Sequence, residues 1–171
     1  MKISNDAKMI TVIVAVGVIG VVLVLAATSN IREPAATPNT EDVDVVVYKT
    51  ASCGCCSKWV EHLQKNGLDV AALNVASTAP AREQAGVPNR LGSCHTAVVG
   101  DYWVQGHVPA ELVYRLITER PADIEGIAVP GMPAGSPGME GPNPVEYDVI
   151  AYHTDGSSSV YATLQGKDSP D

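Results

Sequence analysis

Residues 43–67 read VDVVVYKTASCGCCSKWVEHLQKNG. The first part of this stretch, Val43 to Lys49, is rich in β-branched residues and predicts a short buried strand. A loop with three cysteines follows. Ser57 to Asn66 then places apolar residues on one side and charged residues on the other, which predicts an amphipathic helix, and Gly67 is a typical helix stop. The stretch therefore predicts a strand, a cysteine loop and a helix in direct succession.

The elements that follow complete one domain. They are a strand at Val70–Val75, a short helix between Ser77 and Gly86, strands at Thr96–Val99 and Tyr102–Gln105 joined by a tight turn, and a helix at Pro109–Glu119. The Pro residues near both helix starts and the Gly after the first support these boundaries. The order β-α-β-α-β-β-α is that of the thioredoxin fold. We therefore expect an α/β, thioredoxin-like mixed sheet flanked by helices on both faces.

The C-terminal third differs in composition. Residues 126–144 are rich in Gly and Pro and predict irregular structure. Tyr147 to Tyr152 and Ser159 to Leu164 predict a C-terminal β-hairpin that turns at Asp155-Gly156. Residues 166–171 are a polar tail, so the folded domain is expected to span residues 43–165.

The N-terminus carries a membrane or signal segment, residues 1–27. Met9 to Ala27 contains no charged residue, and at 1.5 Å per residue it reaches roughly 28 Å, about the thickness of a bilayer core. This length favours a transmembrane helix that stays as an anchor. The alternative is a cleaved signal peptide, whose apolar region is usually shorter. Residues 28–42, rich in Pro, Thr and acids, predict a linker.

Charge indicates on which side of the membrane the domain lies. Lys2 and Lys8 precede the apolar segment, and acidic residues follow it, so the positive-inside rule places the domain outside the cytoplasm. In a bacterium this means an inner-membrane anchor with the domain in the periplasm, or secretion to the periplasm if the segment is cleaved. The net charge of −8 argues against nucleic acid as a partner.

The cysteine loop, Cys53-Gly54-Cys55-Cys56, carries the chemistry. Thiols at a helix start lie near free N–H groups and the positive end of the helix dipole, which favours the thiolate. Disulfide exchange needs two cysteines, one to attack and one to resolve. The third thiol therefore favours a soft metal such as Cu(I), Zn or an iron–sulfur centre. Thiol–disulfide exchange by Cys53 and Cys56, and two structural disulfides in an oxidising compartment, remain as alternatives.

Cys94 is the fourth cysteine of the chain. In a thioredoxin-like fold the residues just before the third strand face the C-x-x-C loop. Thioredoxins carry a cis-proline there, whereas this chain has Cys94-His95. We interpret this change as a gain of metal ligands, so Cys94 and His95 join the candidate site.

Three further residues are candidate ligands. Met132 and Met139 lie in the Gly/Pro-rich segment, and a thioether is a soft ligand that suits Cu(I), although Met also fills the rims of cores. His107 comes at the start of a predicted helix, where it can bind metal or cap the helix. By contrast, we expect His62 to be solvated and His153 to lie at a hairpin turn, both without a role in metal binding.

At these residues the chain resembles the CopG-like proteins, exported copper-associated proteins long classed as a domain of unknown function. The matching segments are the Cys53–Cys56 loop with Trp59, Ser93 to Ala97, Gly106 to Ala110, Val129 to Pro133, and Gly135 to Glu140. Together they span roughly residues 44–164. Several motifs in the same order make this resemblance specific.

The resemblance implies a thioredoxin-like fold that holds several Cu(I) ions in one cysteine-bound cluster. It also implies a role in copper resistance, interconversion of copper oxidation states, and copper export or copper resistance proteins as partners. A copper oxidoreductase activity is therefore left open. Zinc also accepts four cysteines as a single ion, so the residues alone leave the metal open between copper and zinc.

Overall fold

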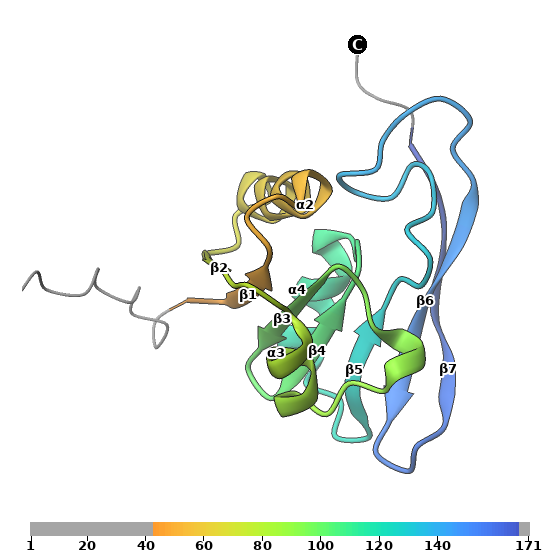
Figure 1. Cartoon of the computed structure of the whole chain (residues 1–171). Coiled ribbons are helices and arrows are strands. Elements are labelled where there is room, and N and C mark those ends of the chain that lie inside the picture. Colours follow the sequence, from red (N-terminus) through yellow and green to blue (C-terminus); the bar gives the residue numbers. More distant parts are fainter. Residues whose placement is uncertain (1–42, 168–171) are drawn as a thin grey trace, which may run out of the picture. The chain divides into compact units, whose positions relative to one another are not determined.

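The strand that precedes the cysteine loop lies inside a seven-stranded mixed sheet (Figure 1). The computed structural model describes residues 43–167. The strands are β1 (Val45–Lys49), β2 (Val70–Asn74), β3 (His95–Val99), β4 (Tyr102–Gln105), β5 (Ile124–Ala128), β6 (Glu146–His153) and β7 (Ser158–Gln165). The helices are α2 (Gly54–Lys65), α3 (Ala79–Gln84) and α4 (Ala110–Glu119), with a 3-10 turn, η1, at Asn89–Leu91.

The strand order in the sheet is β2-β1-β3-β4-β5-β6-β7. Strand β1 pairs in parallel with β2 and antiparallel with β3, and β3 and β4 form the predicted hairpin. Strand β5 lies parallel to β4, and the C-terminal hairpin of β6 and β7 extends the sheet from β5. The expectation of a mixed α/β sheet is confirmed, and the last hairpin lies where the sequence predicts it.

The main core lies between one face of the sheet and helices α2 and α4. Alternate residues of β1, Val45 and Val47, point into it and pack with Trp59 and Leu63 of α2 and Leu116 of α4. A smaller apolar cluster on the other face is formed by Trp103, Ala128, Val87 and Leu91, so the segment containing α3 and η1 covers that side. The main core fixes the position of the first turn of α2 relative to β1 and β3.

Strand β5 corrects the prediction that residues 126–144 are irregular from their first residue. Residues 126–128 belong to this strand, and the Gly/Pro-rich stretch without helix or strand begins at residue 129 and ends at residue 145. Gly126 pairs with Trp103 of β4, and a Cβ atom on Gly126 would overlap the Trp103 indole ring. The glycine therefore makes room for a neighbouring aromatic ring inside a sheet, whereas the sequence pattern suggested a loop.

The helix at the cysteine loop also begins earlier than predicted. Cys53 is its N-cap, in an extended conformation, and α2 starts at Gly54 instead of Ser57. The backbone N–H of Ser57 donates to the Cys53 carbonyl, which closes the first helical turn around the cysteines.

Three predicted segments lie outside the described residues. They are the membrane or signal segment 1–27, the linker 28–42 and residues 168–171 of the tail. Within residues 43–167 the structure contains no helix that is both long and apolar enough to cross a bilayer.

Candidate metal centre

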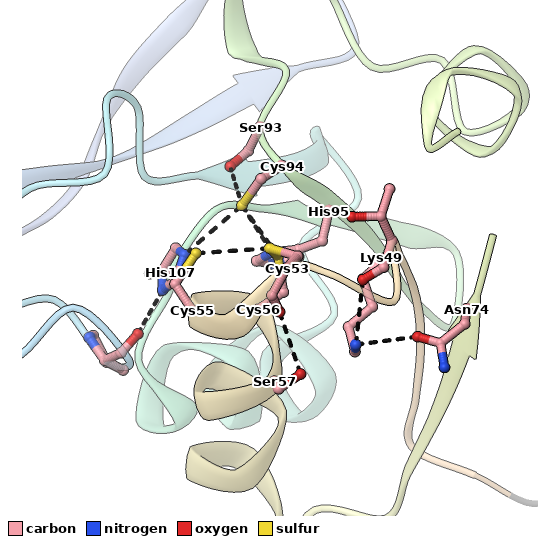
Figure 2. Close-up of a disulfide and its surroundings, with 12 residues drawn as sticks. Lys49, Cys53, Cys55, Cys56, Ser57, Asn74, Ser93, Cys94, His95 and His107 are labelled. Atoms are coloured by element: carbon pink, nitrogen blue, oxygen red, sulfur yellow. Dashed lines mark hydrogen bonds between the residues drawn. A yellow bond between two sulfur atoms is a disulfide. The ribbon is translucent and has the colours of Figure 1, made fainter. Parts of the chain in front are cut away.

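Three of the four cysteines lie at the first turn of α2. Cys53 caps the helix and forms a disulfide with Cys56, while Cys55 is a free thiol (Figure 2). The Cys55 sulfur lies 3.7 Å from the Cys53 sulfur. Cys56 is fully buried, and Cys53 and Cys55 are partly exposed. The cluster is therefore anchored in the core on one side and open to solvent on the other.

Cys94 approaches this turn from the residue just before β3. Its sulfur lies 3.2 Å from the Cys56 sulfur, although the two residues are 38 positions apart in the sequence. The sulfur atoms of Cys53, Cys55, Cys56 and Cys94 all lie within 4.8 Å of one another. Because β3 pairs with β1, the loop before β3 meets the loop after β1, which brings the four predicted residues together.

Two buried histidines adjoin the cysteines. His95 is the first residue of β3, and its ring stacks on Trp59 of α2 with centroids 4.4 Å apart. His107 follows β4 and meets His95 edge to face at 5.5 Å. Cys94, His95 and His107 form a second group whose ligand atoms lie within 4.8 Å of one another, so Cys94 is common to both groups.

A hydrogen bond defines the tautomer of His107. Its Nδ1 lies 2.6 Å from the carbonyl oxygen of Pro137, which can only accept a hydrogen bond, so Nδ1 carries the proton. In the neutral ring Nε2 then has a free lone pair, and this atom lies 4.0 Å from the Cys94 sulfur. A backbone carbonyl that orients a histidine in this way is typical of metal sites.

The Gly/Pro-rich segment closes over the first turn of α2. Gly138 lies so close to the helix that an added Cβ atom would stand 2.9 Å from both the Cys55 carbonyl oxygen and the Trp59 backbone nitrogen. Met139, which follows Gly138, is partly buried and donates its N–H to the Ser136 carbonyl over 2.7 Å. Met132 is 44% exposed and has a left-handed backbone with φ of 51°. The segment thus brings Met139 beside the cysteine helix and leaves Met132 on the surface.

Comparisons with known proteins find relatives of this chain. Residues 91–139 match the family described as "Protein of unknown function, DUF411", a range that holds Cys94, His95, His107, Met132 and Met139. Two solved structures, entitled "Copper resistance protein copG- Form 2" and "Copper resistance protein copG- Form 1", are 41% identical to this chain with a TM-score of 0.66. They cover 71% of this chain and 98% and 97% of their own chains. This chain belongs to the CopG-like family. None of the curated proteins compared with it matches.

Burial determines the charge state of the CopG-like site without metal. It lowers the pKa of His95 to about 3, with a further lowering by His107, and it lowers the pKa of His107 against the opposing effect of the Pro137 carbonyl. Burial also raises the pKa of the Cys94 thiol, and Cys55 adds to that shift. The histidines are therefore neutral near pH 7, as a metal ligand must be, and a metal that binds Cys94 must displace its proton.

Lys49 is a neighbour of the site that sequence reasoning missed. It is only 7% exposed and pairs across β1 and β3 with His95, so both side chains lie on the same face of the sheet. Its ammonium group donates to neutral oxygens, the Asn74 side chain at 3.1 Å and the Thr50 carbonyl at 3.4 Å. The alternation of Val45, Val47 and Lys49 was the signal that would have shown this burial.

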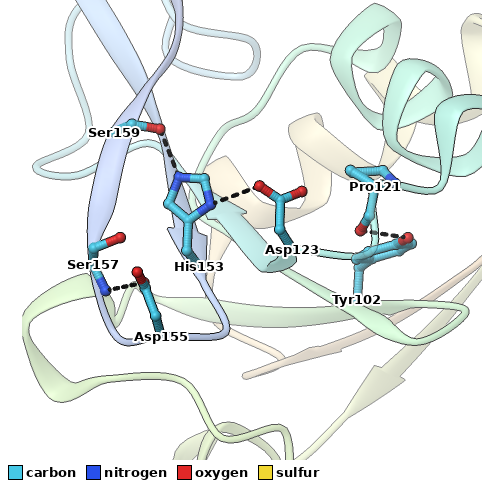
Figure 3. A network of polar contacts seen from close by, with 7 residues as sticks. All are labelled: Tyr102, Pro121, Asp123, His153, Asp155, Ser157 and Ser159. Atoms are coloured by element: carbon cyan, nitrogen blue, oxygen red, sulfur yellow. Dashed lines mark hydrogen bonds and ion pairs between the residues drawn. The ribbon is translucent and has the colours of Figure 1, made fainter.

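The remaining two histidines lie outside both groups of candidate ligands. Contrary to the prediction that it is solvated, His62 is partly buried. Its Nε2 accepts a hydrogen bond of 3.1 Å from the backbone N–H of Ala110 at the start of α4. His153 ends β6, where Nδ1 lies 3.3 Å from the Asp123 carboxylate and Nε2 lies 2.8 Å from the Ser159 hydroxyl (Figure 3). Both have structural partners of their own.

Proposed function

We propose that this protein binds copper as Cu(I), through a cluster that Cys53, Cys55, Cys56 and Cys94 bridge, and that it serves copper resistance or homeostasis. The observation that carries this proposal is the convergence of four sulfur atoms within 4.8 Å. Relatives named copper resistance proteins, 41% identical over nearly their whole length, support it.

The ligand chemistry favours copper in more than one ion. Thiolates are soft ligands that suit Cu(I), and four of them around a single Cu(I) would leave a net charge near −3. Thiolates shared between several ions balance this charge better. His107, with its free Nε2, and His95 supply nitrogen ligands at the inner side, and Met139 supplies a thioether from the segment that covers α2. Met132 of the same segment, at the surface, is the outermost candidate ligand.

Copper redox chemistry follows from the same residues. Oxidation of the Cys53 and Cys56 thiolates to their disulfide releases two electrons, which is the number needed to reduce two Cu(II) ions to Cu(I). In this proposal copper is the substrate, and the disulfide between Cys53 and Cys56 is the oxidised form of the protein. Cu(I)/Cu(II) interconversion is therefore part of the proposal.

The proposed fold and location agree with this role. The sheet order β2-β1-β3-β4, with β1 parallel to β2 and antiparallel to β3, supports a thioredoxin-like core to which β5, β6 and β7 are added. Residues 1–27 are proposed to hold this core at the inner membrane, or to direct it to the periplasm. There, copper export or copper resistance proteins are its proposed partners.

Metal analysis of the reduced, anaerobically purified chain tests the function. We expect more than one Cu(I) per chain, retained against a Cu(I) chelator, and a lower copper content after Cys94→Ser. Uptake of a single zinc ion with no retained copper would contradict the proposal, as would copper binding that Cys94→Ser leaves unchanged.

A second candidate is a thiol–disulfide oxidoreductase that uses Cys53 and Cys56. The observation in its favour is their disulfide at the N-terminus of α2, where a thiolate is stabilised. Reduction of insulin by the metal-free protein tests it. Turnover that survives both Cys55→Ser and Cys94→Ser would favour this function over copper chemistry.

A further inference from the structure

The disulfide of this protein has a third sulfur atom in contact with it. The Cys94 sulfur lies 3.2 Å from the Cys56 sulfur, and Cys56 is already bonded to Cys53 (Figure 2). A disulfide bond is about 2.05 Å long, so a movement of about 1 Å would bring Cys94 to bonding distance. Cys55, the other free thiol, lies farther away, at 3.7 Å from Cys53.

From this contact we infer that Cys94 exchanges with the Cys53–Cys56 disulfide, so that the metal-free oxidised protein interconverts between a Cys53–Cys56 bridge and a Cys56–Cys94 bridge. The Cys94 thiol gives up its proton, and its sulfur forms a bond with the Cys56 sulfur. The Cys53–Cys56 bond breaks, and Cys53 leaves with the electron pair and takes up a proton. The number of disulfides is unchanged, so no external oxidant or reductant is consumed.

The positions of the three residues favour this direction of attack. Cys56 is fully buried in the core, so an external thiol reaches it less readily than the Cys94 sulfur, which already lies 3.2 Å away. Cys53 is the N-cap of α2, where unpaired backbone N–H groups and the helix dipole stabilise the negative sulfur that leaves. The central sulfur of the exchange is thus held in place, and the leaving sulfur of Cys53 is partly exposed.

The exchange gives the site a way to begin copper uptake while it is still oxidised, an extension that rests on the proposed function. When Cys56 and Cys94 are bridged, Cys53 and Cys55 are both free, and their sulfur atoms lie 3.7 Å apart in the present structure. Two adjacent thiols that are open to solvent are a suitable first binding point for one Cu(I) ion. The Cys53–Cys56 bridge instead leaves Cys55 and Cys94 free, both partly exposed and within 4.8 Å of each other, so the exchange changes which pair of thiols can take the first ion.

Disulfide mapping of the full-length, metal-free, oxidised protein tests the exchange. The protein is denatured in acid to stop exchange, its free thiols are alkylated, and the bridged peptides are identified by mass spectrometry. We expect both bridges in the wild-type protein, only Cys53–Cys56 after Cys94→Ser, and Cys56–Cys94 after Cys53→Ser. Cys55→Ser is the matched control and should keep both bridges.

A kinetic measurement on the native protein gives an independent result. Cys53 should be alkylated about tenfold more slowly in Cys94→Ser than in the wild-type protein, because without Cys94 its sulfur stays in the disulfide. Absence of the Cys56–Cys94 bridge from the wild-type protein, with equal alkylation rates in the two proteins, would overturn the inference. Circular dichroism confirms that each variant is folded. Because no copper is present, failure of copper binding leaves this result unaffected.

Discussion

Gly138 lies against the backbone of Cys55: a Cβ atom on Gly138 would stand 2.9 Å from the Cys55 carbonyl oxygen. The glycine also has a positive φ of 82°, which residues with a side chain rarely adopt. The Gly/Pro-rich segment can therefore close over the cysteine helix only if this position carries no side chain. The contact couples the Met139 region to the first turn of α2.

Replacement of Gly138 by alanine should detach this segment from α2. The clash and the left-handed backbone together are expected to cost at least about 1–2 kcal/mol of stability. The variant should lose Cu(I) to a chelator faster than the wild-type protein. Gly141→Ala is the matched control, because its Cβ would meet no heavy atom within 4 Å and its φ is not positive. Equal copper loss from both variants would contradict the proposed role of the segment.

His107 is expected to contribute to copper retention through its oriented Nε2. His107→Phe keeps an aromatic ring in the buried position but removes both the bond to the Pro137 carbonyl and the nitrogen near Cys94. We expect copper affinity to fall about tenfold or more, as when oriented ligands or their partners are changed in metal sites. Chelator competition measures the effect. His153→Asn, far from the cysteines in the fold, should leave the affinity unchanged, and an equal loss there would disprove a specific role for His107.

The parts of the fold that local sequence determines were predictable. The β-branched run before the cysteines, the amphipathic helix after them and the last hairpin each depend on neighbouring residues. The convergence of Cys94 with the cysteine loop was predictable as well, because the order of elements places the residues before β3 opposite that loop.

The features that were missed depend on residues far apart in the sequence. The strand β5 carries a glycine at position 126 because the Trp103 ring occupies the place of a side chain there, and no local pattern in the sequence indicates that ring. His62 is on the expected side of α2, but the start of α4 reaches it and donates a hydrogen bond from Ala110. Lys49 continues an apolar alternation, yet its charge made burial an unexpected outcome.

Trp59 supports the site through a hydrogen bond that a phenylalanine cannot make. Its indole N–H donates to the Val108 carbonyl over 2.8 Å, next to His107, and its ring stacks on His95. Trp59→Phe leaves that buried carbonyl without its partner and should lower the free energy of unfolding by about 1–3 kcal/mol. Urea denaturation measures this loss.

The chain offers a matched control for this substitution. Trp103 is equally buried, at 2% exposure, but its indole nitrogen has no hydrogen-bond partner among the described residues. Trp103→Phe therefore loses ring volume without losing a hydrogen bond. A destabilisation by Trp103→Phe as large as that by Trp59→Phe would show that the Val108 bond contributes little.

The metal-free protein should lose stability as the pH falls below about 6.5. Burial is the main cause that lowers the pKa values of His62, His95 and His107 in the folded state. Between the unfolded and folded pKa values the unfolded chain binds more protons, so the free energy of unfolding falls with falling pH, by up to about 1.4 kcal/mol per pH unit for each histidine. At pH values well above 6.5 the histidines are neutral in both the folded and the unfolded state, so they do not change the free energy of unfolding with pH. Urea denaturation at a series of pH values from 7.5 downward measures the slope.

His62→Gln separates the contribution of one histidine from the rest. A glutamine side-chain oxygen can still accept the hydrogen bond of Ala110, but it does not titrate. The variant should therefore match the wild-type protein near pH 7.5 and show a shallower loss of stability below pH 6.5. An unchanged slope would mean that protonation of His62 does not disturb the contact between α2 and α4. A loss of stability already at pH 7.5 would mean that the imidazole ring itself, through its packing, holds the start of α4.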